Sequence, residues 1–299
     1  MSMPVPQVVE VFAPAKINLT LHVTGQRPDG YHLLDSLVAF ADVGDVLRLE
    51  PADVWQMKTV GPEAEAVPDG AENLVLKAAA LLDGAPKAAF TLTKNLPVAS
   101  GIGGGSADAA AAFRGLCAAT PHHDPNNIDT QRRLLSLGAD IPMCLHCVTA
   151  RITGIGEEIT PVAQFPALHA VLINPRVAVS TPAVFKAMKQ RNNPPMPDIP
   201  PESCDVKDLV EWLRAQRNDM QEAATTLEPA IATVQAALEG HRACQLARMS
   251  GSGATCFGLF HTAQAAQQAA RDLSRDYPQW WIRPTQLGSQ AERAVPRLS

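Results

Sequence analysis

The chain has 299 residues, of which 46% are hydrophobic and 18% are charged, a composition typical of globular proteins that excludes disorder along the whole length. The formal charge of −5, from 25 Lys and Arg against 30 Asp and Glu, lacks the basic excess that a dominant nucleic-acid surface needs. A chain of this length exceeds the usual single core, so two domains or one large α/β unit are expected.

Targeting and redox features are few. No run of about 18 apolar residues occurs, so the sequence predicts no membrane span. Residues 1–4 carry neither a basic nor an apolar leader segment, which favours a cytoplasmic protein. The six cysteines include one C-x-x-C spacing, Cys144 to Cys147, but no second such pair for a structural zinc site. A redox pair stays open at this spacing, and ordinary buried or half-buried thiols are favoured.

Strands and helices alternate in the first half of the chain. Val5–Phe12 is rich in β-formers, and Ile17–Thr24 predicts a strand with Ile17, Leu19, Leu21 and Val23 on one face. Further strands are predicted at Asp45–Glu50 and Ala88–Thr93, and helices at Glu72–Leu82, Ser106–Ala119 and Gln131–Leu137.

The composition changes between Ile159 and Phe165, and this change predicts a boundary between domains 1–162 and 163–299. Asn192–Pro201 is rich in proline and predicts an extended loop. The other predicted elements of the second half are strands at Ala170–Asn174, on both sides of Gly251 and at Trp280–Arg283, and helices at Val206–Gln216, Leu227–Leu238 and Thr262–Asp276. Interleaved strands and helices in both halves predict two α+β domains.

A glycine-rich loop is the most informative stretch. Four glycines in five positions, between Gly101 and Gly105, follow Pro97 and precede an alanine-rich helix for which Ser106 is a suitable N-cap. Free N–H groups at a helix N-terminus form an anion site, most naturally for phosphates. The loop is not a Walker A motif, because no Gly-Lys-Ser/Thr occurs in the chain, and it fits the dinucleotide-binding pattern poorly. A tight turn without a ligand is the alternative.

A second glycine cluster occupies residues Met249–Cys256, around Gly251 and Gly253. Taken alone, it is typical of a hairpin turn. Together with the first loop, it indicates a second wall around a polyanionic ligand.

Three segments together resemble the GHMP kinase superfamily, which contains galactokinase, homoserine kinase and mevalonate kinase: Pro14–Leu19, Pro97–Asp108 and Ser250–Ala254. Three others resemble the branch that acts on 4-diphosphocytidyl-2-C-methyl-D-erythritol: Pro28–His32, Gly138–Pro142 and Arg217–Met220. The resemblance runs from about residue 10 to about residue 285, with the motifs in the expected order. It departs at Cys147, where the family usually has a glycine, and in the proline-rich stretch Asn192–Pro201.

The resemblance implies a two-domain α+β fold, with an N-terminal ribosomal-protein-like domain, a C-terminal ferredoxin-like domain and the site between them. It implies a kinase that uses ATP and Mg²⁺ and moves the γ-phosphoryl group to the 2-hydroxyl of the methylerythritol moiety, in the non-mevalonate route to isoprenoid precursors. It also implies a small-molecule substrate, no nucleic-acid or membrane partner, and a monomer or weak homodimer.

By resemblance, Asp140 is the catalytic base and Lys16 is its partner, although on sequence alone the two fit a turn residue and a surface charge. Asp108 is expected to cap its helix by its place in the first turn, rather than to bind magnesium. Substrate recognition falls by resemblance to Asn18, Tyr31, His32 and Thr181. The Tyr31 ring is a flat surface for stacking cytosine, and the alternative for Tyr31 and His32 is a capped hairpin exit.

The resemblance assigns ATP binding to the loop and to two residues expected near the adenine: Pro97, Val98, Ala99, Ser100, Gly101, Ile102, Gly103, Gly104, Gly105, Ser106 and Ala107, with Asn73 and Lys94. No protein ligand of a metal is assigned. Two other functions stay open: a GHMP kinase for another alcohol, such as mevalonate or homoserine, and a non-catalytic nucleotide- or RNA-binding module.

Overall fold

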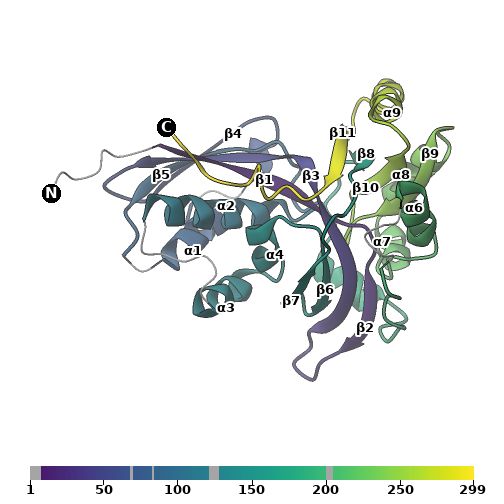
Figure 1. Cartoon of the computed structure of the whole chain (residues 1–299), viewed down its shortest axis with the longest axis horizontal. Helices are drawn as coiled ribbons and strands as arrows, with labels where there is room; N and C mark the ends of the chain where they lie inside the picture. Colours follow the sequence, from purple (N-terminus) through teal and green to yellow (C-terminus); the bar gives the residue numbers. More distant parts are fainter. Residues whose placement is uncertain (1–7, 68–69, 83, 121–127, 200–204) are drawn as a thin grey trace.

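The computed structural model describes residues 8–67, 70–82, 84–120, 128–199 and 205–299. These residues form one continuous sheet of twelve strands, in which only β4 and β5 pair in parallel. Seven strands follow the order β12-β1-β3-β11-β8-β10-β9, and the other five branch from β3 or extend those branches. Figure 1 shows the two halves of the chain side by side, joined by this sheet.

The first half contains the longest strand of the molecule. Its strands are β1 (Val9–Asn18), β2 (His22–Gln26), β3 (His32–Pro51), β4 (Gln56–Val60), β5 (Ala88–Thr93), β6 (Ala150–Gly154) and β7 (Glu158–Pro161). Its helices are α1 (Leu74–Ala80), α2 (Gly104–Ala119), α3 (Ile128–Leu137) and α4 (Ile141–His146). These helices lie together on one side of β1 and β3 (Figure 1). Alanines of α2 and the large side chains Phe40, Phe90 and Phe113 form the core beneath them.

The second half repeats the combination of sheet and helices. Its strands are β8 (Leu168–Asn174), β9 (Cys244–Met249), β10 (Cys256–Phe260), β11 (Trp281–Gly288) and β12 (Arg297–Leu298). Its helices are α5 (Thr181–Ala187), α6 (Val206–Arg214), α7 (Gln221–Leu227), α8 (Ala230–Glu239) and α9 (Ala263–Asp276). A second core lies among β8, β10, α8 and α9, around Ile173, Val234 and Phe260.

The end of the chain returns to the first half. Strand β11 pairs with both β8 and β3, and β12 pairs with β1. Ala294 packs in the core of the first half, where its carbonyl accepts a hydrogen bond of 3.1 Å from Arg114 Nε. The domain boundary near residue 162 stays a prediction, and the last residues pack on the far side of it.

Most predicted elements are present, with three differences. The predicted strand 45–50 is the end of the much longer β3. This strand can contain polar residues such as Asp35 and Asp45 because partners far away in sequence satisfy their carboxylates. The predicted strand 17–24 is interrupted between β1 and β2, so Ile17 and Leu19 fill a different core from Leu21 and Val23. The predicted helix 227–238 corresponds to α8, which begins at Ala230 after its N-cap Pro229, and α7 before it was not predicted.

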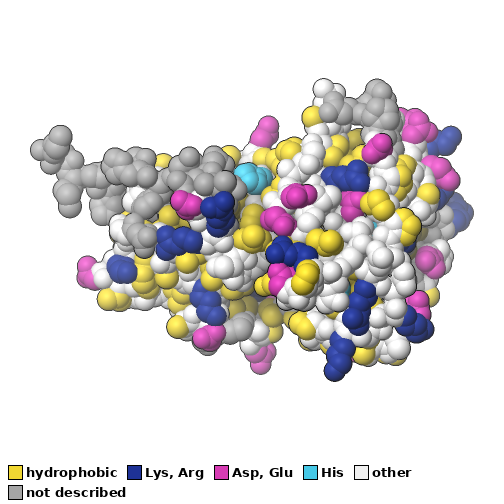
Figure 2. Space-filling view, turned by 90° about the horizontal axis from the view of Figure 1, so that it is seen from below, with side chains coloured by type: hydrophobic (Ala, Val, Ile, Leu, Met, Phe, Trp, Pro, Cys, Tyr) yellow, Lys and Arg dark blue, Asp and Glu magenta, His cyan; other side chains and the backbone are white. Residues whose placement is uncertain are grey.

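The surface carries mixed charge. On the face shown in Figure 2, Lys and Arg side chains are interspersed with Asp and Glu side chains. Among the residues that the structure describes, no helix is both long and apolar enough to cross a bilayer.

Candidate active site

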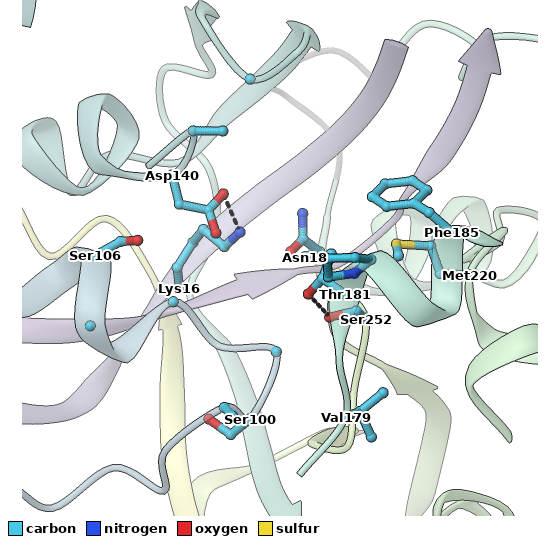
Figure 3. A pocket seen from close by; sticks show the side chains of 18 of the residues that line it. Lys16, Asn18, Ser100, Ser106, Asp140, Val179, Thr181, Phe185, Met220 and Ser252 are labelled. Carbon is cyan, nitrogen blue, oxygen red and sulfur yellow. Dashed lines mark hydrogen bonds and ion pairs between the residues drawn. The ribbon is translucent and has the colours of Figure 1, made fainter. Parts of the chain in front are cut away.

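A cavity of about 1120 Å³ is lined by residues from both halves of the chain. The end of β1, the β2–β3 hairpin, the glycine loop 97–106, the start of α4, helix α5 and the β9–β10 turn all contribute to its wall. In the view of Figure 3, Lys16 and Asp140 lie on one side and Phe185 and Met220 on the other, with Thr181 and Ser252 between them.

The glycine loop ends in the N-terminus of α2. Gly103 is the N-cap, with a left-handed φ of 66°, and no side chain caps the helix. Ser106 is therefore inside the helix, and the prediction that it is the N-cap was wrong, because a glycine can take the left-handed conformation that starts the helix earlier. The helical bond from Ala107 N to Gly103 O leaves the preceding N–H groups without intrahelical acceptors. These groups lie at the cavity wall and fit a phosphate.

The second glycine cluster packs against the first glycine loop. Gly101 has φ of 75°, and a Cβ there would lie 2.6 Å from the carbonyl oxygens of Gly253 and Ser250. Thr255 N donates to Ser100 O at 3.1 Å, and Ser250 Oγ donates to Gly101 O at 3.1 Å. The cluster is a hairpin turn between β9 and β10, and its Gly251 and Ser252 also line the cavity. The hairpin turn is therefore confirmed, and its position at the cavity is compatible with a wall around a polyanionic ligand, which stays a prediction.

Lys16 and Asp140 form an ion pair at the cavity, with 2.7 Å between Nζ and Oδ1. A β-bulge between Pro14 and Lys16 shifts the register of β1, which turns Lys16 and Asn18 to the cavity and Ile17 to the core. Lys16 is buried, whereas 41% of the Asp140 side chain is exposed. This is the contact expected from the resemblance, and the exposed carboxylate is open to a ligand.

Asp140 is placed by α4, of which it is the N-cap residue. Its carboxylate makes no capping bond, so it is directed to Lys16 instead. The helix ends at Cys147, which has a left-handed φ of 51°. Glycine takes this conformation most readily, which agrees with the glycine that the resemblance led us to expect there. Cys144 and Cys147 are both buried, and burial raises the pKa of both thiols.

The orientation of the Asn18 amide follows from its neighbours. Ser36 Oγ donates its single proton to Thr20 O, so it can only accept at 2.8 Å from Asn18 Nδ2. Asn18 Oδ1 is thereby turned away from Ser36, and it is buried without a hydrogen-bond partner among the described residues. An enclosed acceptor at a cavity wall calls for a donor from a ligand.

Lys94 forms a buried triad with two carboxylates. Its Nζ lies 2.5 Å from Asp45 Oδ2 and 2.7 Å from Asp108 Oδ2. Burial lowers the pKa of Lys94, but the two carboxylates outweigh this effect and raise it; burial raises the pKa of Asp108 to about 8. The prediction that Asp108 caps α2 was wrong, because its carboxylate is turned inward to this lysine.

Aromatic rings occupy the other end of the cavity. Tyr31 is 58% exposed at the tip of the β2–β3 hairpin. The His32 ring is stacked on Phe185 with 4.0 Å between ring centroids. Burial, and then the charge of Arg191, lowers the pKa of His32 below its ordinary value of 6.5. A neutral imidazole beside two aromatic faces can read the polar edge of a flat base.

The remaining predicted residues are placed as follows. Thr181 begins α5, and its hydroxyl hydrogen-bonds with Ser252 Oγ at 2.7 Å at the cavity wall. Asn73 is the N-cap of α1 and lines the cavity with Lys94. Nine of the loop residues line the cavity, namely Pro97, Val98, Ala99, Ser100, Gly101, Gly103, Gly104, Gly105 and Ser106.

Two predicted loop residues do not line the cavity. Ile102 packs in the hydrophobic core, and its carbonyl accepts from Lys16 N at 2.9 Å. The Ala107 N–H is already used by Gly103 O in the first helical bond. Ile102 is thus a core residue between cavity-lining neighbours, and Ala107 is buried in the core of the first half.

Sequence reasoning missed three cavity residues of the second half, Phe185, Lys186 and Arg191, and it included Met220 only as part of a motif. Phe185 has a weak signal, an aromatic one turn after the Thr181-Pro182 helix start. Asn218 was noticed only as part of a motif, and its amide holds the second glycine turn by donating to Met249 O and Gly251 O, both at 2.8 Å.

Both halves of the chain match GHMP kinases. Residues 73–149 match the N-terminal domain of GHMP kinases, and residues 202–279 match their C-terminal domain. The chain is 54% identical over 276 residues to the 4-diphosphocytidyl-2-C-methyl-D-erythritol kinase of Dinoroseobacter shibae, covering 92% of this chain and 94% of that protein. It is 53% identical over 283 residues to the protein of the same name from Cereibacter sphaeroides, covering 94% and 99%.

Solved structures agree with these relatives. A crystal structure of 4-(cytidine 5'-diphospho)-2C-methyl-D-erythritol kinase superimposes with a TM-score of 0.74 at 32% identity, covering 94% of this chain and 99% of that one. A homoserine kinase from Cytophaga hutchinsonii has a TM-score of 0.68 at 16% identity, covering 100% and 99%, and shares the fold alone.

Proposed function

Since the chain belongs to the 4-diphosphocytidyl-2-C-methyl-D-erythritol kinases of the GHMP kinase family, with their two-domain α+β fold, we propose that it moves the γ-phosphoryl group of ATP to the 2-hydroxyl of 4-diphosphocytidyl-2-C-methyl-D-erythritol. The product is the 2-phosphate of the same compound, an intermediate on the non-mevalonate route to isoprenoid precursors. The observation that carries the assignment of roles is the Lys16–Asp140 pair beside the uncapped N-terminus of α2.

Asp140 accepts the proton of the acceptor hydroxyl in this proposal. Its carboxylate is partly exposed to the cavity, where a hydroxyl can reach it. Lys16 holds the carboxylate in place through their ion pair and adds positive charge near the transferring phosphoryl group. The enzyme then works mainly by positioning the two reactants and stabilising charge, as phosphoryl transfer requires.

The glycine loop holds the ATP phosphates through backbone N–H groups. The left-handed Gly103 and the uncapped helix start fit this role. Ser106 offers a hydroxyl to a phosphate or to magnesium. When it is bound, magnesium would neutralise negative charge on the phosphates of ATP. Asn73 and Lys94 lie toward the adenine.

The acceptor occupies the other part of the cavity. Tyr31 stacks on the cytosine, and neutral His32 reads the polar edge of the base. Asn18 presents its enclosed Oδ1 to a hydroxyl of the methylerythritol moiety, and Thr181 adds a further contact. We also propose that the protein works in the cytoplasm as a monomer or weak homodimer, without a nucleic-acid or membrane partner.

Turnover with defined acceptors tests the proposed function. The purified protein with ATP and Mg²⁺ should phosphorylate 4-diphosphocytidyl-2-C-methyl-D-erythritol, with a new phosphomonoester signal by ³¹P NMR, and should leave mevalonate and homoserine unchanged. Equal or better turnover of mevalonate or homoserine would overturn the proposed acceptor. ATP binding without any turnover would favour the non-catalytic alternative.

A further inference from the structure

Two cations of the cavity wall have no acidic partner. Four cationic side chains line the cavity: Lys16, Lys94, Lys186 and Arg191. Lys16 is paired with Asp140, and Lys94 is paired with Asp45 and Asp108. Among the ion pairs of the described residues, none joins Lys186 or Arg191 to a carboxylate. The cavity therefore carries positive charge that is available to an anionic ligand.

Arg191 lies next to the aromatic end of the cavity. It is close enough to His32 for its charge to disfavour protonation of the imidazole. Its Nη2 donates to Lys186 O at 2.9 Å, which brings the two cationic residues together. Arg191 Nε and His32 Nε2 are both enclosed without a hydrogen-bond partner among the described residues. Enclosed polar atoms of this kind are costly unless a ligand satisfies them.

Both cations are held by ordered structure. Lys186 is in the last turn of α5, next to Phe185, whose ring is stacked on His32. Arg191 precedes the proline-rich stretch, whose described part, 192–199, is an extended loop as predicted; residues 200 and 201 lie outside the described residues. Asn193 N donates to Val23 O at 3.1 Å and so fixes the start of this loop on β2.

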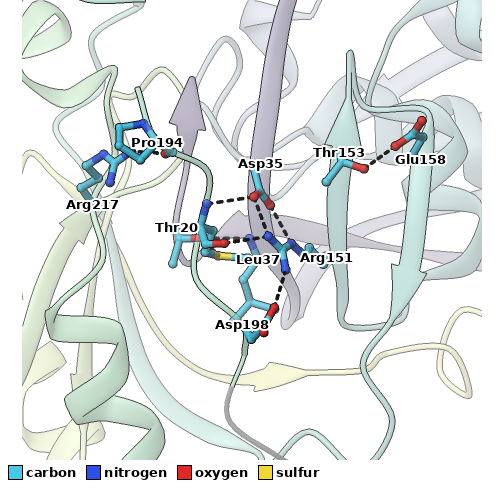
Figure 4. Close-up of polar contacts among 10 residues, drawn as sticks. Thr20, Asp35, Leu37, Arg151, Thr153, Glu158, Pro194, Asp198 and Arg217 are labelled. Atoms are coloured by element: carbon cyan, nitrogen blue, oxygen red, sulfur yellow. Dashed lines mark hydrogen bonds and ion pairs between the residues drawn. The ribbon is translucent and has the colours of Figure 1, made fainter. Parts of the chain in front are cut away.

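Further contacts pin the loop to the sheet. Met196 N donates to Asp35 Oδ2 at 2.9 Å, and Arg151 Nη2 donates to Met196 O at 2.7 Å. Arg151 also forms a two-bond ion pair with Asp35, at 2.8 and 2.7 Å (Figure 4). Arg217 Nη2 donates to Pro194 O at 2.6 Å. The segment that follows Arg191 is therefore anchored against β2 and against β3, the strand that carries His32.

We infer that Lys186 and Arg191 bind the diphosphate of the acceptor, an inference that rests on the proposed function. With the base at the aromatic end and the reacting hydroxyl at Asp140, the diphosphate has to lie between them. Two unpaired cations next to the base site match its two negative charges, and the guanidinium gives directed donors where the ammonium gives a mobile point charge. Tyr31 and His32 then select the base, and the two cations select the diphosphate over an uncharged linkage.

The experiment measures binding of cytidine, CMP and CDP to the full-length protein by calorimetry. It uses the wild type, Arg191→Gln and Lys186→Gln. The matched control is Lys189→Gln on the same segment, since Lys189 is 87% exposed and paired with Glu222 outside the cavity. Each of the two variants should lose CDP affinity by about tenfold or more, while cytidine affinity changes less than about twofold. ATP affinity and the control variant should stay at wild-type values.

The outcomes separate this inference from the proposed function. Equal losses for cytidine and CDP would show that the cations recognise the base. Wild-type CDP affinity in both variants, together with turnover of the acceptor by the wild type, would overturn this inference and leave the proposed function intact. A wild type with neither CDP affinity nor turnover of the acceptor would overturn both. The melting temperatures of both variants are compared with that of the wild type. Equal values show that a loss of CDP affinity does not come from a folding defect.

Discussion

At the scale of single residues, the site depends on polar side chains whose partners are distant in sequence. Lys94 and Asp45 are 49 positions apart, and Asn18 is 232 positions from Ser250, whose hydroxyl accepts its N–H. No local pattern reveals such pairs. Lys16 and Asp140 could be paired from the sequence only through the family resemblance. Lys186 and Arg191 were missed because lysine and arginine residues in short helices and loops are common on any surface.

Ser36→Ala tests whether Ser36 positions the Asn18 amide. The change leaves Asn18 Nδ2 without its acceptor, so the amide can rotate and Oδ1 is no longer held toward the substrate. We expect a loss of kcat/KM for the acceptor of about fivefold to thirtyfold, with unchanged ATP affinity. In an Asn18→Ala background, Ser36→Ala should add almost nothing. Steady-state kinetics of the four proteins measure this, and a full additional loss in the double variant would mean that Ser36 acts only on the fold.

Asp108→Asn tests the protonation of the buried triad. The pKa of Asp108, raised to about 8 from 3.8, means that the folded chain keeps a proton that the unfolded chain releases between these values. Asp108 therefore makes the free energy of unfolding fall as the pH rises through this window, by up to ~1.4 kcal/mol per pH unit. The asparagine variant lacks this slope. The difference in free energy of unfolding, variant minus wild type, should therefore increase from pH 5 to pH 8.

Urea denaturation across this pH range measures the difference. Asp45→Asn is the matched control, because Asp45 accepts from Lys94 and from the N–H groups of Asn95 and Leu96. That variant should be destabilised by about 3–5 kcal/mol at every pH. Parallel pH profiles for the wild type and Asp108→Asn would show that Asp108 is ionised in the folded protein.

At the scale of elements, the glycine loop and its helix were located correctly from the sequence, but their detailed geometry was not. Composition identifies the loop, since four glycines in five positions predict left-handed backbone. It does not say which residue caps the helix, and Gly103 rather than Ser106 is the N-cap of α2. The backbone contact between Gly101 and the Ser250–Gly253 turn links elements 149 positions apart, which a sequence pattern cannot show.

Two glycine substitutions separate ligand binding from folding. Gly105 is exposed at the cavity, and a Cβ there meets only Leu74 Cδ1, at an ordinary 3.4 Å. Gly105→Val should therefore weaken ATP binding by about tenfold or more and change the free energy of unfolding by less than ~1 kcal/mol. Gly101→Ala should cost about 2–4 kcal/mol of stability, because its Cβ would collide with two carbonyl oxygens and its φ is left-handed.

Calorimetric ATP titration and chemical denaturation, applied to both variants, measure these effects. Normal ATP affinity in folded Gly105→Val would contradict phosphate binding by the loop backbone. Wild-type stability of Gly101→Ala would contradict the close packing of the two glycine turns.

At the scale of the whole molecule, the alternation of strands and helices predicted the α+β class, and the motifs predicted which family the fold belongs to. The sequence did not reveal that one sheet runs through both halves, because β11 pairs with β3 and β8 at once. It also did not reveal that residues beyond β11 return to β1, since β12 is only two residues long. Long-range pairing of short segments leaves no periodicity to detect.

The central claim is that Lys16 and Asp140 act as one unit in proton transfer. The most direct test measures the kcat of Asp140→Asn, Lys16→Ala and the double variant. The ATP affinity of each protein is measured separately. The account predicts a loss of ~10²–10⁴-fold for Asp140→Asn with ATP still bound, and a double variant little worse than the worse single one. The exposed pair Lys189–Glu222 serves as the control, and Glu222→Gln should leave kcat unchanged. A near wild-type kcat for Asp140→Asn, or losses that simply multiply in the double variant, would contradict it.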